Sequence, residues 1–218
     1  VVRFHAMGEG RNLLTICEAY WVLVGSAVNL GVLITYPLIE PMYGYWTAHA
    51  VALDTSLLCL LLASVVLVNV GGLITLYLNG INSLGVVLAA SVVRGILSLG
   101  VGGFLFCHFG LAGFGMGILG GELLALLMMG RYFVKRELSR QGVSLPVRPL
   151  VLITASSVSV LIFLMSEGFG FSLAQYLYPV AFLGVATTAL WGWRGLEVGV
   201  RTRLVRMIVD RFAREDVA

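Results

Sequence analysis

The sequence predicts an all-α fold, a polytopic membrane protein with about six transmembrane helices, and three observations support this fold class. Hydrophobic residues make up 59% of the 218 residues and charged residues 11%, whereas soluble domains contain about 25% charged residues. Six apolar stretches of roughly membrane-spanning length follow one another along the chain. If each stretch crosses the membrane once, nearly all basic residues lie on the same side of the membrane. A water-soluble fold is therefore excluded, and the net charge of +3 gives no indication of nucleic acid binding.

Each apolar stretch is interpreted as one transmembrane helix, because about 20 apolar residues cross a bilayer. The six stretches are 13–39, 49–78, 84–106, 111–133, 150–165 and 173–193. The segments between them, 40–44, 79–83, 107–110, 132–149 and 167–170, carry residues typical of turns and loops. The fifth stretch is short and contains three serines, whose hydroxyls can bond back to the backbone of a helix.

The positions of Lys and Arg set the orientation of these helices. With six spans, both ends of the chain and the loops after the second and fourth spans share one side of the membrane. Thirteen of the 14 basic residues lie on that side: Arg3, Arg11, Arg131, Lys135, Arg136, Arg140, Arg148, Arg194, Arg201, Arg203, Arg206, Arg211 and Arg214. By the positive-inside rule this side is the cytoplasm. Tyr43, Tyr45 and Trp46, at the other end of the first span, fit an aromatic belt at the outer interface.

The same pattern divides the chain into four parts. Residues 1–136 hold a cytoplasmic lead-in and four helices, 137–149 form a basic cytoplasmic loop, 150–193 form two further helices, and 194–218 form a basic cytoplasmic tail. Within the tail, 198–212 fits either an amphipathic helix lying on anionic lipids or a solvated basic segment. The chain begins with Val1 and shows no signal-peptide pattern, as expected for a piece of a longer protein.

Two charged residues are expected near the middle of the membrane. Arg94 lies about 14 residues before the turn near 108–109 and Glu122 about 14 residues after it, so both reach a similar depth in adjacent antiparallel helices. A charge at this depth needs a partner or a wet cavity. Two interpretations remain open: a structural ion pair, or an arginine that faces an aqueous cavity and binds an anionic substrate, with Glu122 positioning it or exchanging with that substrate. Asp54 and Glu18 lie nearer to the span ends, within reach of interfacial water.

Gly113, Gly117 and Gly121 recur every four residues, which is typical of a helix face that lets a neighbouring helix approach closely. Motifs of soluble enzymes do not occur: the sequence has no phosphate-binding loop, no metal-ligand spacing and no nucleophile paired with a base. The three cysteines lie in apolar stretches and indicate no disulfide framework. The sequence therefore predicts neither an enzyme nor a protein that holds a cofactor or a metal.

The order of several short motifs is similar to that of a known transporter family. The chain reads Gly-Glu-Gly-Arg at 8–11, Pro-Leu-Ile-Glu-Pro-Met-Tyr-Gly at 37–44, Leu-Asn-Gly-Ile-Asn-Ser at 78–83 and Phe-Gly-Leu-Ala-Gly at 109–113. Residues 3–136 resemble the C-terminal part of a polysaccharide-export, or O-antigen, flippase of the multidrug/oligosaccharidyl-lipid/polysaccharide flippase superfamily. The last two spans resemble the extra pair of its 14-helix members. The resemblance implies that the N-terminal lobe of the same protein is a missing partner.

The resemblance implies a transporter that moves a lipid-linked oligosaccharide, of the undecaprenyl-diphosphate type, across the bacterial inner membrane for lipopolysaccharide or other surface polysaccharide. Arg94 would bind the diphosphate, and Glu122 or Asp54 would be the acidic residue of proton or sodium coupling. Anionic lipids at the cytoplasmic face would be further partners. Two alternatives remain: a cation-coupled multidrug exporter of the same superfamily, and a non-transporting membrane scaffold or subunit that is complete at six spans.

Overall fold

The described part of the chain is helical apart from its turns. A computed structural model describes residues 21–80, 83–138, 147–170 and 174–195, and these residues form no strand. In chain order, with η denoting a π-helical segment, they form η1 (Trp21–Gly25), α3 (Ser26–Trp46), α4 (Thr55–Gly80), α5 (Leu84–Ile96), η2 (Leu97–Val101), α6 (Gly102–Tyr132), η3 (Phe133–Leu138), α8 (Val147–Gly168) and α9 (Ala174–Gly195). The all-α class that the sequence predicts is confirmed.

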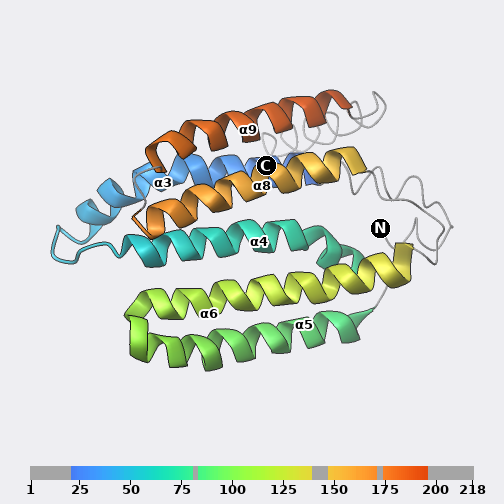
Figure 1. The fold of residues 1–218 in the computed structure, drawn as a ribbon, viewed down its shortest axis with the longest axis horizontal. Coiled ribbons are helices and arrows are strands. Elements are labelled where there is room, and N and C mark those ends of the chain that lie inside the picture. Colours follow the sequence, from blue (N-terminus) through green and yellow to red (C-terminus); the bar gives the residue numbers. More distant parts are fainter. Residues whose placement is uncertain (1–20, 81–82, 139–146, 171–173, 196–218) are drawn as a thin grey trace, which may run out of the picture.

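Three helical segments of this described part are long and apolar enough to cross a membrane: Trp21–Trp46, Thr55–Gly72 and Leu84–Lys135. The third has 52 residues, but it folds back on itself at Gly110, where φ is 61° and ψ is −146°. Its two halves, the first arm (84–109) and the second arm (111–135), run antiparallel (Figure 1). At 1.5 Å per residue each arm is roughly 37–39 Å long, which exceeds the ~30 Å hydrocarbon core of a bilayer.

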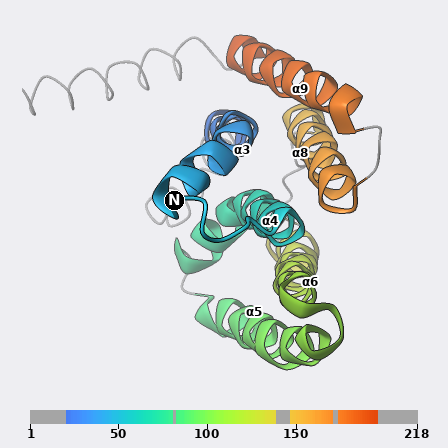
Figure 2. The same ribbon diagram turned by 90° about the vertical axis from the view of Figure 1, so that its left-hand side faces the viewer.

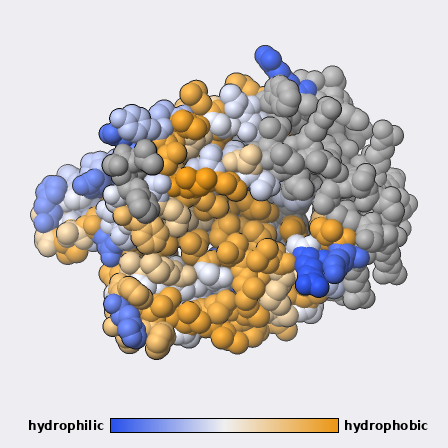
Figure 3. Space-filling view, in the orientation of Figure 1, coloured by the Kyte–Doolittle hydropathy of each residue, from blue (hydrophilic) through white to orange (hydrophobic). Residues whose placement is uncertain are grey.

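The helices form two groups that meet along α4. In one group the two arms of the hairpin pack together, and α6 packs along α4. In the other group α8 packs against both α4 and α9, and α3 packs beside α9 (Figures 1 and 2). The buried apolar residues form two clusters. The cluster that contains Tyr77 and Leu78 of α4 also includes residues of η1, α5, α6, η3 and α8, and the cluster that contains Val160 and Phe163 of α8 also includes residues of α3, α4 and α9. The visible surface over α4, α5 and α6 is largely hydrophobic (Figure 3), as expected for helices that face lipid.

α3 is longer than the sequence pattern indicates. The predicted break at 40–44 is wrong, because the helix continues through Pro37 and Pro41 to Trp46. Pro37 has no N–H to donate to the carbonyl oxygen of Leu33 one turn earlier. The hydroxyl of Tyr178 in α9 donates to that oxygen instead, at 3.0 Å. A neighbouring helix therefore satisfies the backbone group that the proline leaves free, which is how proline is tolerated inside membrane helices.

α4 begins later than the sequence pattern indicates, at Thr55 rather than at residue 49. Ala48 and His49 have φ values of 48° and 59°, a left-handed conformation that ends α3 and turns the chain. Asp54 then opens α4, because its Oδ1 accepts a hydrogen bond from the backbone N–H of Leu57 at 2.9 Å. Its carboxylate occupies the usual position of a helix N-cap.

The remaining predicted breaks agree with the structure in part. α4 ends and α5 begins on either side of 81–83, and α8 ends at Gly168 before a turn at Gly170. The predicted loop at 137–149 is narrower, because η3 extends to Leu138 and α8 begins at Val147. The lead-in before residue 21 and the tail after residue 195, including the predicted amphipathic segment 198–212, lie outside the described residues.

Candidate functional site

The reversal of the chain at Gly110 determines which residues of the two arms face each other. The positive φ of this glycine would be strained for a side chain that carries a Cβ. Backbone contacts between the arms place Gly113 against Leu105, Gly117 against Gly102 and Gly121 against Arg94. The fold-back therefore lies at 108–110, and it places residues near 94 and 122 at the same level of the hairpin.

The glycines at every fourth position of the second arm lie where the two arms touch. A Cβ at Gly121 would be 3.0 Å from the carbonyl oxygen of Arg94 and 3.2 Å from the hydroxyl oxygen of Ser98. A Cβ at Gly113 or Gly117 would collide with the backbone of the first arm. The adjacent Gly120 has open space instead, since nothing lies within 4 Å of a Cβ built there. The close approach of the two backbones thus explains why Gly113, Gly117 and Gly121 are glycines, but it does not explain Gly120 on another face of the arm.

Arg94 and Glu122 form an ion pair between the arms. The Nε atom of Arg94 lies 3.0 Å from Oε1 of Glu122, and the two side chains are 36% and 10% exposed. The buried Nε–H is not aligned for a hydrogen bond, so the contact is a close electrostatic one. Because Glu122 follows Gly121, the close approach of the arms brings the carboxylate within reach of the guanidinium. The proximity that the sequence spacing predicts is therefore present, whichever role the pair has.

A cavity of about 180 Å³ adjoins this ion pair between α4, α5 and α6. Its lining is mostly apolar, and Arg94 and Glu122 are the charged residues in it. Two hydroxyls also line it, but Thr75 donates to the carbonyl oxygen of Gly71 and Ser91 to that of Val87, each within its own helix. The guanidinium is therefore the strongest donor that this lining offers to another molecule.

The arrangement suits the recognition of an anion. A guanidinium carries five N–H donors in a planar fork that matches carboxylate and phosphate groups. Nε faces Glu122, which leaves the donors on the terminal nitrogens of Arg94 for a second acceptor. Apolar surroundings screen charges poorly, so an anion in the cavity would be attracted more strongly than in water. The volume is below the ~300–1,000 Å³ of typical ligand pockets, so it would hold one group of a larger ligand.

Asp54 is not brought to this cavity. The nearest residue of α4 that lines the cavity is Leu67, and 13 residues of helix separate the two positions by about 20 Å. Asp54 is exposed and caps its own helix. Glu18 lies outside the described residues.

Two polar contacts between α3 and α8 do not follow from any sequence pattern. The hydroxyl of Tyr36 donates to Oε2 of Glu167 at 3.1 Å, although the sequence indicated only a turn at 167–170. Deeper in the same interface, Nδ2 of Asn29 donates to the hydroxyl oxygen of Ser157 at 3.0 Å. An amide inside an apolar run is the signal that could have identified the second contact, because such a group must find a partner in the membrane.

The described residues contain no group of three His, Cys, Asp or Glu side chains that could hold a metal ion. Of the described cysteines, Cys59 is buried and Cys107 is exposed, and both are free thiols.

Comparison with protein families, with curated proteins and with solved structures finds no match for this chain.

Proposed function

We propose that this chain is part of a membrane transporter that moves a lipid-linked oligosaccharide, of the undecaprenyl-diphosphate type, across the bacterial inner membrane for export of surface polysaccharide. The observation that supports this most is the partly exposed side chain of Arg94 at a mostly apolar cavity, which Glu122 also lines, between membrane-length helices. In this proposal Arg94 binds the diphosphate. Before the substrate arrives, the carboxylate of Glu122 holds the guanidinium in place, and the diphosphate then displaces that carboxylate.

The apolar surroundings of Arg94 support an amphiphilic substrate. A single cationic group among apolar walls suits a ligand with an anionic group attached to a long apolar chain. The cation-coupled multidrug exporter is a weaker alternative, because an organic cation gains nothing from a guanidinium in the cavity. Asp54 is not included in the transport mechanism, since its carboxylate caps α4 about 20 Å from the cavity.

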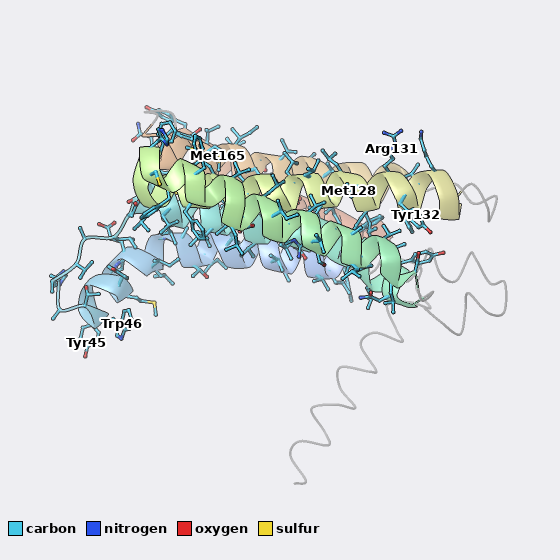
Figure 4. All side chains as sticks on the ribbon, turned by 90° about the horizontal axis from the view of Figure 1, so that it is seen from below. Tyr45, Trp46, Met128, Arg131, Tyr132 and Met165 are labelled. Carbon is cyan, nitrogen blue, oxygen red and sulfur yellow. The ribbon has the colours of Figure 1, made fainter. Side chains whose placement is uncertain are left out.

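In this proposed function the six α-helices of the described residues cross the membrane, and both ends of the chain lie in the cytoplasm. Two observations support this orientation. The exposed Tyr45 and Trp46 lie at one end of the helix bundle, and Arg131 lies at the opposite end (Figure 4). Aromatic side chains favour the interface, and basic side chains favour the cytoplasmic side. The hairpin turn at Gly110 would then face the outside of the cell.

The test of this function uses the complete transporter in cells that depend on it for surface polysaccharide. We expect Arg94→Ala together with Glu122→Gln to abolish export and to cause lipid-linked oligosaccharide to accumulate on the cytoplasmic leaflet. The double variant is chosen because it leaves no unpaired charge in the cavity. Arg131→Ala, which removes an exposed arginine at the end of α6, is the matched control and should export normally. Normal export by the double variant at normal protein levels would show that the pair is structural.

A further inference from the structure

A second group of buried polar side chains lies on the other side of α4, where α3 packs against α8. Asn29 and Ser26 of α3 are 0% and 4% exposed. Nδ2 of Asn29 donates to the hydroxyl oxygens of Ser157 at 3.0 Å and Ser156 at 3.4 Å. Ser156 itself donates to the carbonyl oxygen of Ile153, so towards Asn29 it can only accept. The amide nitrogen of Asn29 therefore has its partners in α8.

Three buried polar atoms of this region have no hydrogen-bond partner among the described residues. They are Oδ1 of Asn29, the hydroxyl oxygen of Ser26, and Nδ2 of Asn69 in α4. The Asn69 nitrogen lies 3.9 Å from the place that a Cβ of Gly25 would occupy, which puts it beside the residue that precedes Ser26. Gly25 and Asn29 are one helical turn apart, so they share a face of the helix. Asn69 of α4 therefore lies beside Gly25, which precedes Ser26 at the start of α3 and lies one helical turn from Asn29.

Leaving these atoms unpaired is costly in an apolar layer, because a buried polar group without a partner has lost the hydrogen bonds that it would make with water. The amide of Asn69 offers a donor, Oδ1 of Asn29 is an acceptor, and the Ser26 hydroxyl can accept. A water molecule matches this set, since it accepts from the first and donates to the other two. A metal cation does not match it, because the N–H groups of Asn69 would repel a positive charge. Turning the Asn29 amide around would only exchange the unpaired oxygen for an unpaired nitrogen.

We infer that α3, α4 and α8 enclose a binding site for one water molecule, which accepts from Asn69 and donates to Asn29 and Ser26. The water connects α3 to α4 across the boundary between the two helix groups. The π-helical segment η1 ends at Gly25, immediately before Ser26. Single turns of π-helix often occur where a helix is adapted to a bound group. The absence of a side chain at Gly25 lets Ile153 of α8 pack closely here, since a Cβ at Gly25 would lie 3.2 Å from Cγ2 of Ile153.

A double-mutant cycle in the full chain, purified in detergent micelles, tests the bridge. Asn29→Ala and Asn69→Ala should each lower Tm, and the double variant should lower it by clearly less than the sum, because both remove one shared water. The unfolding equilibrium constant of the double variant should differ by about threefold or more from the value that additive effects of the two substitutions would give. Ser64→Ala is the control partner for Asn29→Ala, since the Ser64 hydroxyl bonds to Leu61 within its own helix. That pair should be additive. Additive effects of Asn29→Ala and Asn69→Ala would overturn the inference.

Two further measurements separate water from other occupants. The Tm of the unaltered chain should be the same in sodium chloride and in choline chloride at equal ionic strength; stabilisation by sodium that Asn29→Ala abolishes would overturn the inference in favour of a cation. An experimental map at a resolution that shows waters should contain a peak about 2.7–3.2 Å from both Oδ1 of Asn29 and Nδ2 of Asn69. A direct hydrogen bond between the two amides, with no intervening peak, would overturn it.

Discussion

Glu122 is the more deeply buried member of the ion pair, so its carboxylate depends on Arg94 for compensation. Arg94→Ala leaves that carboxylate unpaired beside an apolar wall. We expect the free energy of unfolding to fall by on the order of 1–3 kcal/mol, less than for a fully buried pair because Arg94 is partly exposed. Adding Glu122→Gln removes the unpaired charge and should recover most of the loss. Tm in detergent micelles measures both variants, and a double variant no more stable than Arg94→Ala would contradict this dependence.

Asp54 illustrates a charged residue with a local role. Its carboxylate accepts from the Leu57 N–H at the start of α4, so Asp54→Ala should cost about 0.5–2 kcal/mol of stability. Asp54→Asn keeps a side-chain oxygen at the cap and should cost much less, although it removes the charge. The loss of Tm in the two variants measures this difference. If Asp54→Asn destabilised as much as Asp54→Ala, the charge itself would be the important property.

At the scale of the element, the hairpin formed by the two arms depends on glycines that face the partner arm. Gly121→Ala would place a methyl group 3.0 Å from the carbonyl oxygen of Arg94 and should destabilise the protein by about 1–3 kcal/mol through overpacking. It should also shift Glu122 away from Arg94. Gly120→Ala is the matched control one residue earlier, where nothing lies within 4 Å. That variant should be neutral or slightly stabilising, because alanine favours helix. Equal Tm values for the two variants would contradict the close approach.

α3 shows how a neighbouring element can override a local signal. Two prolines and a glycine in 37–44 are turn signals in isolation, yet the helix continues because α9 supplies Tyr178 to the carbonyl oxygen of Leu33. No property of 37–44 could reveal this, since the compensating hydroxyl lies about 140 residues further along the chain. The break at 167–170 was predictable because it is local, with α8 ending at Gly168 and a positive φ at Gly170.

The two ends of the helix bundle carry different kinds of side chain. The hairpin turn and the end of α3 with Tyr45 and Trp46 lie at one end, and Arg131 lies at the other (Figures 1 and 4). In the proposed orientation these two ends face opposite sides of the membrane.

Cysteine labelling in intact cells tests this orientation. Cys107 is exposed near the hairpin turn, and Asn79 is exposed at the far end of α4. With the other cysteines replaced by serine, a membrane-impermeant maleimide should label Cys107 in intact cells. In a cysteine-free background, Asn79→Cys should be labelled only after the membrane is opened. The opposite pattern would invert the proposed topology, and labelling of both positions from outside would contradict a crossing between them.

Composition and residue spacing were enough to predict the membrane class, the hairpin and the proximity of Arg94 and Glu122. These depend on composition and on counting residues from one turn, because the rise of an α-helix is constant and two antiparallel arms joined by a short turn must align. Other features depend on how the helices pack: α4 adjoins the cavity on one face and carries Asn69 towards the start of α3 on another, and Asp54 lies far from the cavity. Packing between distant segments of the chain sets the face of α4 that each neighbouring helix contacts. The reason is that apolar helices in lipid have no polar face to orient them.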